Sequence, residues 1–332
     1  MSNLDPPSYR LYLKNSIISG KNKHILVEGR DDKYLIEKLW DDFSSQSSFN
    51  NLNKILVDSA ENLIKGEQTN QFLNNRQKVE FIASSVIGQS YAESFVGFVD
   101  RELYKFEWDY DTSAELQDSL NTHEVIQRLV LSRGHSIENY VFDFSILCEV
   151  LEVFSNTVYA RQAIELFKET FQSSLREACS IGLAATKAQV LSKSNSTIDW
   201  KILEIASPVE VSFKFDEWIQ RLIGRGISST QERNLRLYYP MYKEQVSKAS
   251  ISLIRWICHG HTGYDFLRAI YERCIFDVCP NTQDKAKELS GISWVAKDKL
   301  LYSFINSWIK KRLQEQFEYP VAIFELLGVT SL

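Results

Sequence analysis

Acidic side chains follow several segments of this sequence that have the pattern of buried β-strands. Glu28 comes directly after one apolar, branched run, Asp100 and Glu102 come after another, and Glu138 lies just past a further one. In a parallel sheet the carboxyl ends of the strands open on the same edge, which is where open α/β folds bind their ligands. The spacing therefore predicts that these four carboxylates converge at one edge of a sheet.

The chemistry that such a cluster favours is metal-assisted phosphoryl transfer. Unneutralised carboxylates repel one another, whereas Mg²⁺ or Mn²⁺ is bound well by oxygen ligands of this kind. A divalent ion held by few carboxylates keeps positions for water and phosphate. We expect Glu28, Asp100 and Glu102 to be metal ligands and Glu138 to complete or polarise the catalytic site. Glu28 could also act as the base for an attacking water.

A structural explanation competes with the metal site at each position. An acid at a strand end often caps the following helix or lies in a solvated loop, and taken singly each acid is better explained in that way. Asp31 and Asp32 also fall in the first turn of a predicted helix, where anions are favoured. Only the joint placement of acids at the ends of at least two parallel strands favours a metal.

Cationic residues lie beside the predicted carboxylates. Arg30, Lys33, Arg101 and Arg133 could hold a scissile phosphate through charge-assisted hydrogen bonds. Each could equally be a surface partner of its acidic neighbour, which is the better explanation for Lys33.

The elements that must position these residues alternate along the first part of the chain. Strands are predicted over 24–29, 53–59, 94–102 and 127–132, and helices over 31–40 and 76–88. Strand–helix alternation is typical of a Rossmann-like parallel sheet with crossover helices. From about residue 143 apolar residues recur at three- and four-residue spacing, so the remainder is expected to be mostly α-helical. The predicted division is an N-terminal arm (1–20), an α/β catalytic domain (21–142) and a helical domain for partner and substrate binding (143–332).

Composition limits the classes of protein that remain. The chain has 332 residues, 44% of them apolar, with 13 glycines and 6 prolines, which indicates a packed globular protein. Five cysteines without framework spacing, and the lack of an apolar signal-like or membrane-spanning run, predict a reducing, cytoplasmic location. A net charge of −5 means that any nucleic-acid surface must be local. No phosphate-binding loop motif is present, so an ATPase activity would have to come from a partner.

The two strand-end motifs resemble those of the Toprim domain of topoisomerases, primases and related nucleases. The resemblance rests on "VEGRDD" at 27–32 and "FVDRE" at 98–102, where Glu102 replaces the second aspartate of the family pattern. The short motif covers about the first 140 residues. It implies a Toprim fold, Mg²⁺-dependent nuclease activity and a catalytic role for Glu28, and it matches Asp32 to a further acid of the family. "SRGHSIENYVF" and "CHGHTGYDFL" resemble a Toprim-like subgroup with an α-helical C-terminal half.

Over the whole chain the sequence is similar to the Toprim effectors of PARIS anti-phage defence systems. That resemblance implies a toxic nuclease that is held by an ATPase partner of the AAA/ABC type and cleaves host tRNA after release. It also suggests a homodimer once the effector is free. Two alternatives stay open: a DNA nuclease or nickase that uses the same metal site, and a non-catalytic module that binds a partner.

Two further stretches raise hypotheses about the predicted helical half. The window 221–243 holds five cations and three tyrosines and could gather RNA, although a solvated helix face explains it equally well. "WICHGHTGYDF" invites a zinc site, but its spacing matches no standard zinc motif, and a turn with packed histidines is favoured.

Overall fold

The computed structural model describes residues 4–46, 54–64, 74–207, 210–281, 283–312 and 320–329. The chain forms two compact units, and each is described by itself. Unit 1 comprises segments within 1–101, 120–133 and 309–332, and unit 2 comprises 102–119 and 134–308. Both units are therefore assembled from discontinuous segments, whereas the predicted arm and domains were continuous, with boundaries after residues 20 and 142.

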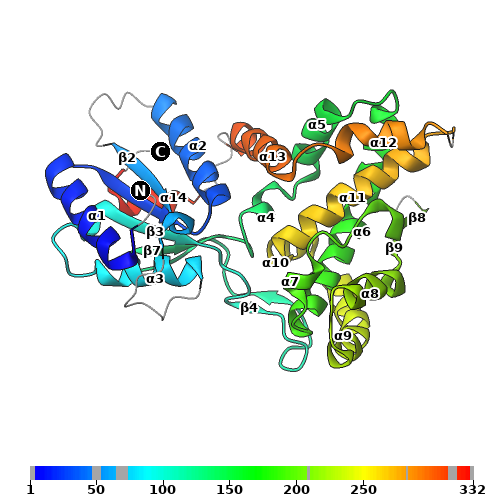
Figure 1. Ribbon diagram of the computed structural model, residues 1–332, viewed down its shortest axis with the longest axis horizontal. Helices are drawn as coiled ribbons and strands as arrows, with labels where there is room; N and C mark the ends of the chain where they lie inside the picture. The colour runs from blue at the N-terminus through cyan, green and yellow to red at the C-terminus, as the bar shows by residue number, and fades with distance from the viewer. Residues whose placement is uncertain are drawn as a thin grey trace. The chain divides into compact units, whose positions relative to one another are not determined.

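Unit 1 contains a five-stranded mixed sheet in the order β2-β1-β3-β7-β6 (Figure 1). The first four strands of this order are parallel, and the edge strand β6 runs antiparallel to β7. The strands are β1 (Lys23–Val27), β2 (Ile55–Ser59), β3 (Phe95–Val99), β6 (Glu124–Ile126) and β7 (Leu129–Leu131). All four predicted strands are confirmed as parallel members of the sheet, although each is shorter than predicted.

The helices of unit 1 follow from the strand order. The chain moves from β1 to one side to form β2, and then back past β1 to form β3. Right-handed crossovers in opposite directions place the intervening helices α2 and α3 on opposite faces of the sheet. The helices are α1 (Pro6–Gly20), α2 (Arg30–Gln46), α3 (Asn75–Ser85) and α14 (Val321–Leu326). Both predicted helices, over 31–40 and 76–88, are present as α2 and α3, and the predicted arm contains helix α1.

Polar contacts fix helix α1 to the sheet. The hydroxyl of Tyr9 donates to Oδ2 of Asp58 at 2.6 Å, and both residues are buried. Nδ1 of His24 lies 3.3 Å from the same oxygen, and Nε2 of His24 lies 2.8 Å from Oγ of Ser16. Asp58 on β2 therefore has donors from α1 and β1, which satisfies a carboxylate that would otherwise be costly to bury.

A glycine in the central strand allows helix α3 to approach the sheet closely. Gly97 lies between Leu26 of β1 and Leu129 of β7 in the ladder. A β-carbon at this position would lie 2.9 Å from Cγ1 of Val79 and 3.0 Å from Cδ1 of Leu129. These separations are shorter than van der Waals contact, so the packing of α3 on β3 requires the missing side chain.

Unit 2 is mostly helical, as predicted, and also contains two short hairpins. Its helices are α4 (Glu138–Val141), α5 (Phe144–Phe154), α6 (Ala160–Lys187), α7 (Leu191–Ser194), α8 (Phe215–Gly224), α9 (Ser229–Lys248), α10 (Ile251–Ile257), α11 (Gly260–Val278), α12 (Lys285–Ser293) and most of α13 (Lys297–Arg312). The hairpins pair β4 (Phe106–Glu107) with β5 (Gln117–Asp118), and β8 (Leu203–Ser207) with β9 (Glu210–Phe213). The long helix α6 packs against both α9 and α11 and forms the centre of the unit. Among the described helices, none is long and apolar enough to cross a membrane.

We predict that Gly97→Ala destabilises the protein because the new methyl group forces α3 away from β3. Overpacking of this kind costs about 1–3 kcal/mol. Gly224→Ala is the matched control, since a β-carbon there meets nothing within 4 Å. Chemical denaturation should show a lower free energy of unfolding than wild type for Gly97→Ala and not for Gly224→Ala. Equal stability of the two variants would contradict the close packing of α3 on β3.

Candidate functional site

Glu28 and Asp100 meet at the carboxyl edge of the parallel strands in unit 1. Each acid is the first residue after its strand, and the two strands are neighbours with Val27 in register with Phe98. The backbone N–H of Asp100 donates to Oε1 of Glu28 at 2.8 Å. The sheet thus brings two of the four predicted residues together, through a contact between the Glu28 carboxylate and the Asp100 backbone.

The end of β2 and the residues that follow it hold the backbone of Glu28. Its carbonyl oxygen accepts from the backbone N–H of Glu61 at 3.2 Å and from Oγ of Ser59 at 3.4 Å. The backbone N–H of Gly29 donates to Oδ2 of Asp32 at 2.8 Å. Asp32 therefore caps the start of α2. Capping was one of the two roles considered for Asp32, the other being that of a further acid of the Toprim pattern.

Asp100 is held from a second direction by a residue that the sequence reasoning missed. Nη1 of Arg76 donates to the carbonyl oxygen of Asp100 at 2.8 Å, and Nε of Arg76 donates to Oε1 of Glu80 at 2.8 Å. Arg76 lies in the first turn of α3, the helix that follows β2. A helix that follows a parallel strand begins at the carboxyl edge of the sheet, so polar residues in the first turn of a crossover helix are candidates to contact the strand-end acids.

The four predicted phosphate donors have different surroundings. Arg30 is exposed, and Nζ of Lys33 lies 3.5 Å from Oε1 of Glu37, which agrees with a surface partner for Lys33. Arg101 is fully buried, and its Nη1 donates to the carbonyl oxygen of Arg133 at 3.0 Å. That burial favours a structural role for Arg101, whereas Arg30 and the partly buried Arg133 stay candidates for phosphate binding.

Glu102 and Glu138 belong to unit 2, so the predicted carboxylates divide two and two between the units. Glu102 is exposed and has φ 54°, an uncommon backbone conformation for a residue other than glycine. Its backbone N–H donates to the carbonyl oxygen of His135 at 2.8 Å.

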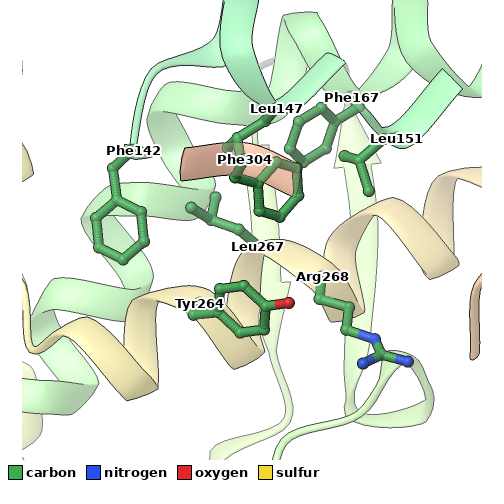
Figure 2. A pocket seen from close by; sticks show the side chains of 8 residues that line it. All are labelled: Phe142, Leu147, Leu151, Phe167, Tyr264, Leu267, Arg268 and Phe304. Carbon is green, nitrogen blue, oxygen red and sulfur yellow. The ribbon is translucent and has the colours of Figure 1, made fainter. Parts of the chain in front are cut away.

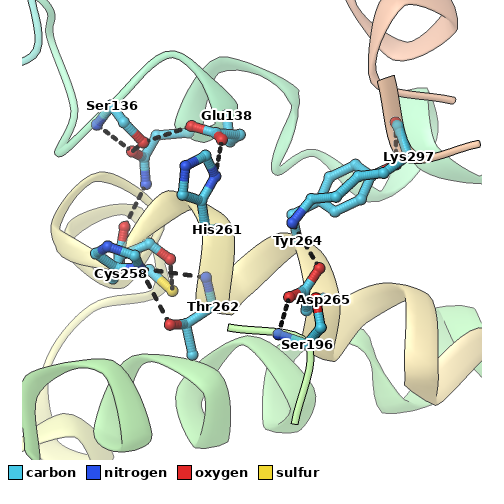
Figure 3. Close-up of polar contacts among 11 residues, drawn as sticks. Ser136, Glu138, Ser196, Cys258, His261, Thr262, Tyr264, Asp265 and Lys297 are labelled. Carbon is cyan, nitrogen blue, oxygen red and sulfur yellow. Dashed lines mark hydrogen bonds and ion pairs between the residues drawn. The ribbon is translucent and has the colours of Figure 1, made fainter. Parts of the chain in front are cut away.

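The buried carboxylate of Glu138 pairs with a half-exposed histidine (Figure 3). Oε1 of Glu138 lies 2.6 Å from Nδ1 of His261, and Oγ of Ser136 donates to Oε2 at 2.7 Å. The Glu138 side chain is only 4% exposed, while that of His261 is 54% exposed. Burial alone would raise the pKa of Glu138, but the hydrogen bond and charge of His261 outweigh it and lower this pKa to about 2. The same hydrogen bond raises the pKa of His261 above its ordinary value.

The segments "SRGHSIENYVF" and "CHGHTGYDFL" contact each other around this pair. Nδ2 of Asn139 donates to the carbonyl oxygens of Arg255 and Cys258 at 2.6 and 2.8 Å. A β-carbon on Gly260 would overlap Oγ of Ser136 and Oε2 of Glu138. Gly260 therefore lets the Glu138 carboxylate reach the N-terminus of α11, where a negative charge is stabilised.

The histidines of this region have mostly structural roles. His259 caps α11, since its Nδ1 accepts from the backbone N–H of Thr262 at 3.2 Å. Burial lowers the pKa of His259 to about 4 and that of His135 to about 3, so both are neutral at physiological pH. In the described part of the chain, no group of three or more histidine, cysteine, aspartate or glutamate residues is arranged to hold a metal ion.

Much of the basic window 221–243 is neutralised within unit 2. Nη1 of Arg221 lies 3.0 Å from Asp199, and Nη1 of Arg236 lies 2.6 Å from Asp216. Nζ of Lys243 lies 2.9 Å from Oε2 of Glu177. Two of the three tyrosines in the window are buried. These contacts favour the solvated helix face over an RNA-binding surface.

An apolar cavity in unit 2 is too small to serve as a substrate site (Figure 2). It has a volume of about 10 Å³, close to the room that one water molecule needs. Its lining includes Phe142, Leu147, Leu151, Phe167, Tyr264, Leu267, Arg268 and Phe304. We interpret it as a packing gap.

Comparisons with known proteins leave the family open. No protein-family model matches the chain, and no curated protein matches it.

We predict that Glu138→Gln removes a pH-dependent part of the stability of unit 2. Glu138 has a lowered pKa, so its contribution is complete above its ordinary value of 4.5 and is lost as the pH falls towards 2. His261 has a raised pKa, so its contribution is complete below 6.5 and is lost as the pH rises through the raised value. The difference in unfolding free energy between wild type and Glu138→Gln should therefore be largest between pH 4.5 and 6.5.

An NMR titration of the His261 ring provides the direct measurement. Its pKa should fall towards the ordinary histidine value in Glu138→Gln and stay raised in Glu169→Gln, which replaces an exposed glutamate on α6. An unchanged His261 pKa in Glu138→Gln would refute the pairing.

Proposed function

We propose that the protein is a metal-dependent phosphodiesterase of the Toprim nuclease type, with Glu28 and Asp100 as its central acids. The observation that carries the proposal is the contact between these residues at the carboxyl edge of β1 and β3. Two acids from separate parallel strands lie close enough for the amide of one to donate to the carboxylate of the other. The placement of two such acids side by side at the carboxyl edge of the sheet supports a role in binding.

The chemistry of the donor set fits a hard divalent cation. Mg²⁺ is commonly bound through only one or two carboxylates, with waters and substrate phosphates as the other ligands. A carboxylate can accept several hydrogen bonds or ligands, so Glu28 can hold the Asp100 amide and still contribute to a cation site. When bound there, the ion would supply charge stabilisation at the phosphate and a lowered pKa for attacking water.

The protein residues have distinct proposed tasks around this chemistry. Glu28 and Asp100 supply the negative charge that holds the cation, and Glu28 also orients the Asp100 backbone. Arg30 is exposed at the start of α2 and is a proposed donor to a substrate phosphate, as is Arg133. Glu102 and Glu138 stay predictions as catalytic residues, and the contacts of Glu138 with Ser136 and His261 favour a structural role for it.

The biological setting is proposed from the sequence resemblance to PARIS effectors. On that resemblance, the protein is proposed to be a toxic enzyme of an anti-phage defence system. It would act in the cytoplasm on host tRNA after release from an ATPase partner. A homodimer after release belongs to the same proposal. RNA is favoured over DNA on this ground alone, so the test must include both.

We predict that purified full-length protein cleaves nucleic acid in Mg²⁺ and not in EDTA, with tRNA favoured over plasmid DNA. Glu28→Gln and Asp100→Asn should each lower the cleavage rate by at least about 100-fold because one anionic ligand is lost. Glu28→Gln keeps an oxygen that can accept the Asp100 amide, so its fold should be intact. The assay measures product formation on denaturing gels.

Two variants serve as controls. Asp32→Asn should have a milder effect, because asparagine can also cap α2, and Glu169→Gln should have none. Cleavage at the wild-type rate by folded Glu28→Gln would refute the metal site. Cleavage of plasmid alone would favour the DNA nuclease, and no cleavage of either substrate with intact folding would favour the binding module.

A further inference from the structure

The backbone just beyond β3 is held on three sides by side chains of unit 1. The N–H of Asp100 donates to Glu28 at 2.8 Å, and the carbonyl oxygen of Asp100 accepts from Arg76 at 2.8 Å. The next N–H, of Arg101, donates to Oγ of Ser132 at 2.9 Å. These contacts come from residues that follow β1, begin α3 and follow β7. These three hydrogen bonds take the place of sheet hydrogen bonds where β3 ends. The backbone of Asp100 and Arg101 is therefore held in one position.

The position of the Arg76 side chain is set by contacts within helix α3. Asn74 and Gln77 form a capping box at the start of α3, with N–H to side-chain oxygen distances of 2.9 and 3.2 Å. Glu80, one turn further along the helix, accepts from Nε of Arg76 at 2.8 Å. The Arg76 side chain is 20% exposed. Glu80 therefore orients the guanidinium group so that Nη1 is directed at the Asp100 carbonyl.

The reach of Arg76 depends on the close packing of α3. Gly97 lies three residues before Asp100 on β3, and Val79 and Ala83 of α3 lie over it. A larger residue at 97 would move the helix that carries Arg76. The short distance between Arg76 and Asp100 is thus a consequence of a glycine in the centre of the strand.

We propose that Arg76 is a positioning residue that sets the orientation of Asp100 for cation binding by holding its backbone carbonyl. This inference rests on the proposed function. Nη1 of Arg76 contacts the Asp100 carbonyl and its Nε contacts Glu80, which places Arg76 to act through Asp100. Its positive charge would repel a cation, so it is not proposed as a ligand. The planar fork of arginine suits this task because Nη1 and Nε can hold two acceptors at once.

The test measures Mn²⁺ binding by calorimetry, together with kcat and KM for tRNA cleavage, in Arg76→Gln and Arg76→Lys. Residues that orient metal ligands typically affect metal affinity or activity by about 10–100-fold when they are replaced. We expect Arg76→Gln to weaken Mn²⁺ binding and lower kcat by about that factor, with little change in KM. Arg76→Lys should recover only part of the loss, because a lysine cannot hold both acceptors. Arg161→Gln, at an exposed arginine on α6, is the matched control.

A double-mutant cycle with Asp100→Asn decides whether Arg76 acts through Asp100. If it does, Arg76→Gln should cause no further loss of Mn²⁺ binding in the Asp100→Asn background. The inference would be overturned if Arg76→Gln weakened Mn²⁺ binding equally in wild type and in Asp100→Asn. It would also be overturned if Arg76→Gln raised KM and left kcat and Mn²⁺ binding unchanged, because that result indicates direct contact with substrate phosphate. If Arg76→Gln does not fold, Arg76→Lys carries the cycle.

The same data separate this inference from the proposed function. Unchanged Mn²⁺ binding and cleavage in both Glu28→Gln and Asp100→Asn would refute the metal site itself. Losses in those two variants, combined with wild-type behaviour of Arg76→Gln, would refute only the positioning role.

Discussion

The hydrogen bond from the Asp100 amide to the Glu28 carboxylate connects the ends of two neighbouring parallel strands. It exists because β1 and β3 are adjacent, with Val27 opposite Phe98, so that the residues following the two strands lie close together. The strand order places β3 beside β1, and Gly97 lets helix α3 pack closely on β3. The proposed cation site, the backbone contacts around Asp100 and the role of Arg76 all depend on this one pairing.

Many charged groups in unit 2 pair with one another. Lys187 on α6 lies 2.6 Å from Asp109 and 2.8 Å from Asp111 in the loop between β4 and β5, and these hydrogen bonds raise its pKa. The buried Glu138 has a histidine and a serine as partners. At the buried Glu138, removing its histidine partner would leave an uncompensated buried charge, so this pair holds its two segments together.

The sequence predicted most of the sheet because its strands are buried and apolar, and because turns and helices separate them regularly. It also predicted that Glu28 and Asp100 would meet, since parallel strands share a carboxyl edge. Arg76 was missed because its role comes from a helix start whose distance to Asp100 is set by packing. Glu138 was grouped with the strand-end acids because it follows β7 closely in sequence, whereas its partner His261 is distant in the chain and no local pattern reveals the pairing. The β8–β9 hairpin alternates buried and exposed residues, a signal that the helical periodicity on either side obscured.

Paramagnetic NMR with Mn²⁺ tests the central claim most directly, because it reports where a cation binds without requiring substrate or activity. In isotope-labelled full-length protein, low concentrations of Mn²⁺ should first broaden the backbone amide signals of Gly29, Asp100 and Arg101. Glu28→Gln should abolish that selective broadening. Broadening that instead begins around Glu138 and His261, or spreads evenly over exposed acids, would contradict a cation site at the carboxyl edge of β1 and β3.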